Sequence, residues 1–122
     1  MSEYRLMRIE GVIQEIISTL ILTGKVKDHR VSRMISINRV KCASDLSIAK
    51  VYVSGFESEK VTRRSVEGLN SAAPFIQGIV GKKIQTRLTP KLTFVYDDSI
   101  REGFEINKKI EEILSQPLWH HP

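Results

Sequence analysis

Lysine and arginine side chains offer this chain its clearest chemistry, which is the binding of phosphate groups. The densest group is Lys82, Lys83, Arg87 and Lys91, in a stretch that contains no acidic residue. Cationic side chains contact nucleic-acid phosphates mainly through charge and without reading the base sequence. The candidate RNA-contact residues are Arg5, Arg8, Lys25, Lys27, Arg30, Arg33, Arg63, Arg64, Lys82, Lys83, Arg87 and Lys91.

The charge of the whole chain also favours a polyanionic partner. Nineteen basic residues against fourteen acidic residues give a formal net charge of +5, and the sequence pI is about 9.5. Residues 1–96 hold sixteen bases and eight acids, whereas residues 97–122 hold three bases and six acids. A basic body is therefore expected, although any single basic residue can equally belong to an ordinary solvated surface.

Residues that commonly carry catalysis form no recognisable active-site pattern. The neighbours Asp97 and Asp98 would point to opposite faces of a strand, so they are poor paired carboxylates. His29 has no serine or cysteine nucleophile motif to serve, and no phosphate-binding loop or dinucleotide fingerprint occurs. The single cysteine, Cys42, excludes an internal disulfide and a cysteine-rich zinc site. We predict a protein that is not an enzyme and uses no cofactor or metal.

The start of the chain shows no export signal. Residues 1–5 lack the basic and then apolar layout of a secretory leader, and no apolar run approaches the roughly 20 residues that span a bilayer. The lone thiol suits a reducing compartment. We expect a soluble cytoplasmic monomer with neither a membrane nor a small molecule as its partner.

The first element predicted is a helix. Apolar residues recur at helical spacing from Leu6 to Ile21, and Gly24 is suited to the position just after a helix end. The helix should therefore close near Leu22 or Thr23. A basic connector, residues 25–33, follows it.

Two strands are expected next. The apolar residues change parity between Ile37 and Val40, which predicts a bulge near Asn38 and Arg39. A turn precedes residues 49–53, which alternate as a second strand. The two strands should form an antiparallel hairpin.

A broken pair of helices follows the hairpin. Ser58 can cap the first of them, and Pro74 interrupts the helical pattern because it has no N–H to donate. Pro74 is expected in the first turn of a restarted helix, so the residues of the interhelical kink are Ala72, Ala73 and Pro74. The second helix is predicted to end with Gly81 as its cap.

The third strand covers residues 92–96, and a last helix beginning at Ser99 stops before Pro117. Strands two and three are joined by a helical crossover, so they should be parallel with a right-handed connection. The fold class is α+β, with the order α-β-β-α-α-β, a C-terminal helix and a three-stranded mixed sheet with helices on one face. This order is that of a type II KH-like domain over residues 1–116, followed by a short mobile tail at 117–122.

Two runs carry a resemblance to a known family. Residues 45–54 have the pattern D-L-S-x-A-x-V-Y-V-S, and residues 87–99 have R-x-x-P-x-L-x-F-x-x-D-x-S. Together with Arg5 to Ile9, which match R-x-x-R-V, they resemble the ribosome-binding factor A family. The resemblance covers about residues 4–114 and implies a KH-like fold.

The resemblance also implies a function. It implies a non-enzymatic factor that binds the small ribosomal subunit, assists late maturation of its rRNA, acts beside other assembly factors and supports growth in the cold. Two departures stand out. Asp28-His29-Arg30 replaces the usual Asp-Pro-Arg, and Ala72-Ala73-Pro74 replaces the Ala-x-Gly kink.

Residues 78–81 form a literal G-x-x-G, the sequence with which ordinary KH domains clamp a nucleic-acid backbone. Their middle residues are apolar and they fall within a predicted helix, so we expect no clamp there. The resemblance implies that the kink replaces it and that RNA contact depends on charge and shape. Among aromatic residues, Tyr52 faces away from the core and is a better stacking candidate than Phe94.

Two alternatives remain open at this point. A general single-stranded RNA-binding KH module would bind short oligonucleotides, whereas a small protein-interaction domain with incidental basicity would bind little RNA at about 0.15 M salt. An assembly factor would prefer the structured subunit to either.

Overall fold

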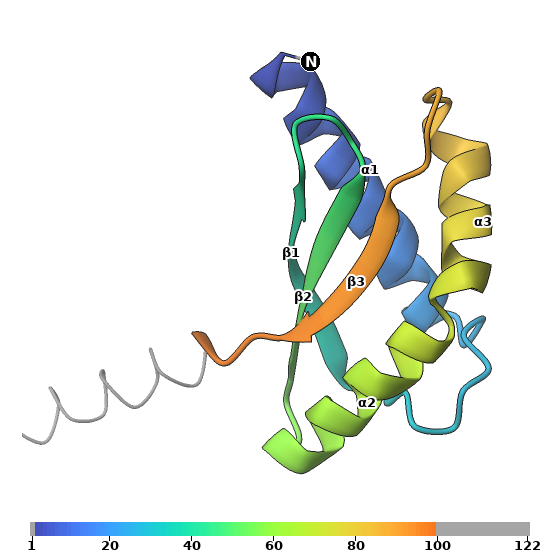
Figure 1. Cartoon of the computed structure of the whole chain (residues 1–122). Coiled ribbons are helices and arrows are strands. Elements are labelled where there is room, and N and C mark those ends of the chain that lie inside the picture. The colour runs from blue at the N-terminus through green and yellow to red at the C-terminus, as the bar shows by residue number, and fades with distance from the viewer. Residues whose placement is uncertain (1, 100–122) are drawn as a thin grey trace, which may run out of the picture.

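The computed structural model describes residues 2–99 of the chain. Its elements follow the expected order α-β-β-α-α-β, which is confirmed (Figure 1). The C-terminal helix and tail that the sequence predicts beyond Ser99 lie outside the described residues. The elements are α1 (Glu3–Leu22), β1 (Ile35–Cys42), β2 (Ile48–Gly55), α2 (Glu59–Ser71), α3 (Ala73–Ile84) and β3 (Lys91–Tyr96).

The three strands form one mixed sheet in the order β1-β2-β3. The β1–β2 pair is antiparallel and the β2–β3 pair is parallel, as expected for a hairpin followed by a helical crossover. The register of β1 shifts between Ile37 and Arg39, so the predicted bulge is confirmed. In Figure 1, α1 passes behind the strands and α3 lies beside it.

The core fills the space between the sheet and the helices. The isoleucines on the inner face of α1 recur every four residues, and Ile13 and Ile17 are completely buried. Val51, Val53 and Phe94 meet them from the sheet and are buried to 2% exposure or less. This single apolar layer fixes α1 across the strands, since each of these side chains would lose its partners if the helix shifted.

The end of α1 is closed as expected. Thr23 is the C-cap, and Gly24 has a positive φ of 69°, a conformation that glycine adopts without steric cost. A Cβ atom at Gly24 would also collide with the Arg33 guanidinium. The positive φ is the stronger reason for glycine there, because the exposed Arg33 side chain could move aside.

The break between α2 and α3 occupies a single residue. Ala72 caps the end of α2 and also precedes α3, and Pro74 lies in the first turn of α3. The predicted restart is confirmed. Pro74 fits because the first N–H groups of a helix have no intrahelical acceptor to lose.

The prediction that Gly81 caps α3 is wrong. The helix continues to Ile84, and Gln85 closes it in the left-handed region with φ of 47°. The small size of Gly81 matters for packing instead, because a Cβ atom there would lie 2.6 Å from Thr89 Oγ1. The G-x-x-G run is thus an ordinary part of a helix, and no loop is available for a backbone clamp.

Helix side chains occupy the outer edge of β3. The Asn70 carboxamide donates to the carbonyl oxygen of Phe94 and accepts from its N–H, each at 2.9 Å. Gln77 Oε1 accepts from the Leu92 N–H at 3.0 Å. One amide lies before the break at Ala72 and the other after it, so the kinked helix pair follows the strand.

Side chains of α1 form hydrogen bonds to the outer edge of β1 in the same way. A Glu10 carboxylate oxygen accepts from the Cys42 N–H at 2.7 Å, and Gln14 Nε2 donates to the Ile37 carbonyl oxygen at 2.9 Å. Unpaired strand edges invite pairing with another chain. Side chains from the helices partly satisfy both edges of this sheet.

Removing the Asn70 amide should destabilise the fold. Asn70→Ala leaves the Phe94 N–H and carbonyl without their partners, so the free energy of unfolding should fall by about 1 kcal/mol. Urea denaturation measures this change. Lys60→Ala, an exposed position on the same helix, is the matched control; equal stability of the two variants would contradict the role assigned to Asn70.

Candidate nucleic-acid interface

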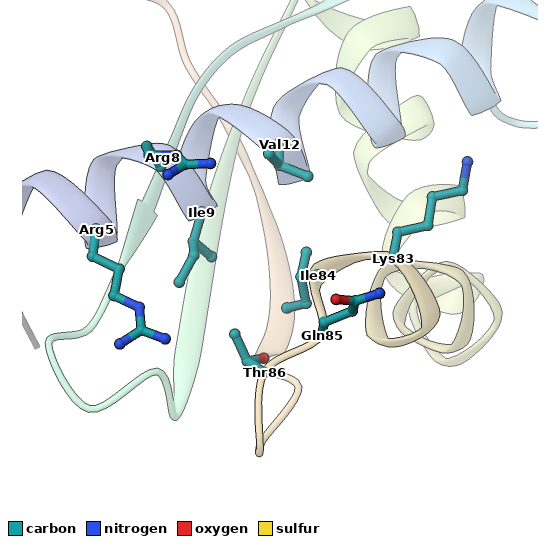
Figure 2. Close-up of a pocket in the computed structure, with 8 residues that line it drawn as sticks. All are labelled: Arg5, Arg8, Ile9, Val12, Lys83, Ile84, Gln85 and Thr86. Atoms are coloured by element: carbon teal, nitrogen blue, oxygen red, sulfur yellow. The ribbon is translucent and has the colours of Figure 1, made fainter.

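A groove runs between the start of α1 and the end of α3 (Figure 2). Its volume is about 350 Å³, and none of the lining residues in the described part of the chain is acidic. Arg5 and Arg8 come from α1, three residues apart and therefore on one face of that helix, while Lys83 comes from α3. The lining residues are Arg5, Arg8, Ile9, Val12, Lys83, Ile84, Gln85 and Thr86.

The three cations of the groove are exposed and take part in neither of the ion pairs found within residues 2–99. Ile9, Val12 and Ile84 supply the apolar lining, and Gln85 and Thr86 add polar side chains. Cations without a protein counter-charge are available to phosphate. The structure thus joins two sets of residues that are more than seventy positions apart in the sequence.

The structure does not place the predicted basic cluster around Lys82 on a single surface. Lys82 and Arg87 are exposed and lie next to Lys83 and Thr86 in the chain, but they are not among the residues that line the groove. Lys91 begins β3 and alternates with the buried Leu92. It therefore faces the side of the sheet away from the helices.

The connector and the start of α2 form a second basic region. Arg30 and Arg64 line a pocket of about 170 Å³ together with His29 and Glu57. The three other basic residues of the connector, Lys25, Lys27 and Arg33, are exposed.

Arg30 is held by the fold itself. Its Nε and Nη2 atoms donate to the two carboxylate oxygens of Asp28 at 3.0 and 2.8 Å, and Nη2 also donates to Ser71 Oγ at 2.9 Å. These bonds place the pKa of Asp28 well below its usual range, mainly through the Arg30 side chain, and raise the pKa of Arg30. The Asp28–Arg30 pair thus forms with His29 between its members.

Arg63 is also held by contacts within the protein. Its guanidinium lies 3.3 Å from a Glu59 carboxylate oxygen, and its Cζ atom is 4.4 Å from the centroid of the Tyr96 ring. Arg63 therefore ties α2 to the end of β3, which leaves it less free than the cations of the groove.

Sequence reasoning did not include three further basic residues that share a surface with Lys91. Arg39, Lys41 and Lys50 are exposed on the strands, on the face opposite the core. Their alternation with Val40, Cys42 and other buried residues was the available signal. Tyr52 does face away from the core, but its ring is covered by Arg39, with Cζ 4.4 Å from the ring centroid.

Neither a metal site nor a reactive thiol is found within residues 2–99. No three histidine, cysteine, aspartate or glutamate side chains of this part are grouped to hold a metal ion. Burial raises the pKa of the Cys42 thiol to about 11, so it is a poor nucleophile. None of the helices in the same range is long and apolar enough to cross a membrane.

Comparisons with known proteins all point to one family. The family model for ribosome-binding factor A matches residues 5–110. A protein of that name from Treponema denticola is 49% identical over 113 residues, which cover 93% of this chain and 86% of the relative. The chain belongs to the ribosome-binding factor A family. A family member from Treponema pallidum is 41% identical over 114 residues, covering 93% of this chain and 90% of that protein.

Solved structures agree with the fold. The solution structure of a Thermotoga maritima ribosome binding factor A has a TM-score of 0.68 and 26% identity, covering 81% of this chain and 92% of that one. The crystal structure of the Thermus thermophilus protein has a TM-score of 0.62 and 20% identity, covering 75% of this chain and 94% of that one. The KH-like fold expected from the sequence is confirmed.

The Asp28–Arg30 pair predicts a pH-dependent change in stability. A carboxylate whose pKa falls on folding contributes stability above its unfolded pKa, near 3.9, and loses that contribution as the pH falls through the folded value. Asp28→Asn should therefore lower the melting temperature near pH 7, and the difference from the original chain should shrink as the pH falls below about 4.

Thermal unfolding at several pH values measures this difference. Asp98→Asn removes an exposed carboxylate outside the pair and serves as the control. A difference between Asp28→Asn and the original chain that stays constant down to about pH 2 would contradict the ion-pair explanation.

Proposed function

We propose that this protein is a non-enzymatic assembly factor that binds the small ribosomal subunit and assists late maturation of its rRNA. The observation that carries the proposal is the groove between α1 and α3, which is lined by Arg5, Arg8 and Lys83 and, among residues 2–99, by no acidic residue. Family membership supports it. So does a model of the Thermus thermophilus family member that was fitted into a map of a 30S complex, with a TM-score of 0.60, 20% identity and coverage of 75% of this chain and 93% of that one.

The groove suits an RNA backbone for a physical reason. Exposed cations bind phosphates by releasing condensed counterions, and this gain does not depend on base sequence. The three cations come from two helices that the fold holds side by side, which limits the backbone paths that can reach all of them. Binding of this kind recognises folded rRNA by shape and charge together.

The kink of Ala72, Ala73 and Pro74 contributes by placing α3. Because α2 ends at Ala72, α3 can take its own direction and bring Lys83 beside the start of α1. If α2 continued straight, Lys83 would not lie beside the start of α1. The kink is therefore proposed as a positioning element of the RNA interface, not as a group that touches RNA.

The proposed mechanism is a shift in population. A factor that binds one folding intermediate of the rRNA more tightly than others increases the share of that intermediate. It leaves when the mature arrangement forms or another assembly factor displaces it. A cytoplasmic monomer that chemically alters nothing is sufficient for this role.

A general single-stranded RNA-binding KH module is less well supported. Such modules clamp four nucleotides with a G-x-x-G loop, whereas residues 78–81 are helical here. The remaining cations are spread over surfaces that suit a large folded RNA better than a short strand.

Reversing one groove charge should weaken binding to the small subunit. Lys83→Glu removes a cation from the groove and introduces an anion, so co-sedimentation with purified small subunits should fall several-fold at about 0.15 M salt. Lys60→Glu makes the same change near the start of α2, away from the groove, and should have a smaller effect.

Two readouts test this prediction. Equal retention of Lys83→Glu, Lys60→Glu and the original chain would remove the groove from the interface. In cells that rely on the Lys83→Glu variant, unprocessed small-subunit rRNA should accumulate; normal processing despite lost binding would contradict the maturation role.

A further inference from the structure

The face of the sheet turned away from the helices has a one-sided charge. Within residues 2–99 no strand contains an acidic residue, and the four charged residues of these strands are Arg39, Lys41, Lys50 and Lys91. All four are exposed and alternate with buried residues, so they share this open face. They come from all three strands. In Figure 1 this face lies opposite α1.

Two of these lysines are direct cross-strand partners. Lys41 pairs with Lys50 in the antiparallel register, and like charges in such a pair repel each other. Neither takes part in an ion pair within residues 2–99. The arrangement is unfavourable for the isolated protein and becomes favourable when an anion lies between the two ammonium groups.

Arg39 and Tyr52 form the next cross-strand pair on the same face. The guanidinium lies over the Tyr52 ring, with Cζ 4.4 Å from the ring centroid. The ring holds Arg39 by a cation–π contact, and a guanidinium held in this way can receive phosphate or stack on a base.

Acids at the two ends of this face are already hydrogen-bonded. Asp45, in the turn between β1 and β2, accepts from the Ser47 N–H at 3.0 Å and from Ser47 Oγ at 2.7 Å. Asp97, just after β3, accepts from Asn38 Nδ2 at 3.0 Å and from the Ser99 N–H at 3.0 Å. These hydrogen bonds, that of Asn38 foremost, lower the pKa of Asp97. The nearby Arg39 also lowers the pKa of Asp97, but within residues 2–99 no ion pair joins Asp97 to Lys41 or Lys50.

We propose that the open face of the sheet is a second RNA-contact surface, which binds phosphodiester backbone through Arg39, Lys41, Lys50 and Lys91. The proposal rests on the proposed function in that RNA is the partner of the protein. It deepens that function, because the α1–α3 groove and this face lie on different sides of the molecule. The protein can then hold two segments of rRNA at once.

The charge of this face favours RNA as its partner. A protein partner could not add a strand easily, since helix side chains bond to backbone groups along both outer edges of the sheet. A polyanion can use the face itself. Phosphates spaced along a backbone also match cations spread over three neighbouring strands.

Lys50→Glu separates binding from stability. The change converts the repelling Lys41–Lys50 pair into one of opposite charges, so the melting temperature should stay equal or rise. Affinity for a short fluorescein-labelled RNA hairpin, measured by anisotropy, should nevertheless fall several-fold. The slope of log affinity against log salt should become shallower by about 1.

Lys60→Glu on α2 is the matched control for net charge, and Lys50→Gln tests the loss of the cation without a new anion. Lys50→Gln should weaken binding less than Lys50→Glu and more than Lys60→Glu. An equal loss in Lys50→Glu and Lys60→Glu, or no loss in either, would overturn the proposal. Unchanged RNA affinity with an altered oligomeric state in Lys50→Glu would show that the face joins copies of this chain, and would also overturn it.

The two proposals can fail separately. Hairpin binding that depends on Lys50, in a protein that shows no preference for small subunits, would support this face and refute the assembly role. Selective subunit binding that depends on Lys83 and is indifferent to Lys50 would refute this face alone.

Discussion

The hydrogen bonds between helix side chains and the sheet edges are the constraint on which the rest of the molecule depends. A three-stranded sheet has two outer strands whose outward N–H and carbonyl groups need partners. Asn70 and Gln77 supply them along β3, and Glu10 and Gln14 supply them along β1. These bonds add fixed points along each outer strand to the apolar packing that holds the helices against the sheet.

The break at Ala72 follows from the same constraint. Asn70 reaches Phe94 from the last turn of α2, and Gln77 reaches Leu92 from the first half of α3. The helix pair must bend to follow a twisted strand, and Pro74 makes the bend at a position where a missing N–H is harmless. The end of α3 then lies beside α1, where the basic groove forms.

Much of the fold could be predicted because its signals are local. The helical period of α1, the parity change around Asn38, the cap at Ser58 and the restart at Pro74 each depend on residues close together in sequence. The end of α3 could not be predicted in this way. Gly81 looked like a cap, but its small size serves contact with Thr89, which reaches it from the following loop.

The candidate site was predictable in composition more than in arrangement. Charge identified Arg5, Arg8 and Lys83, but only the packing of α3 on α1 shows that they line one groove. Arg30 proved to be bonded to Asp28, which a list of basic residues cannot reveal. The sheet residues were passed over because each one looks isolated in the sequence, although their shared parity placed them on one face. The role of the kink in RNA binding stays a prediction.

Sedimentation of the purified protein with separated small subunits, large subunits and joined ribosomes tests the central claim most directly. The account predicts retention on free small subunits in preference to the other particles, with part of that retention surviving moderate salt, because shape as well as charge is recognised. Equal retention on every particle that disappears at moderate salt would contradict it, since basic charge alone would then explain the binding.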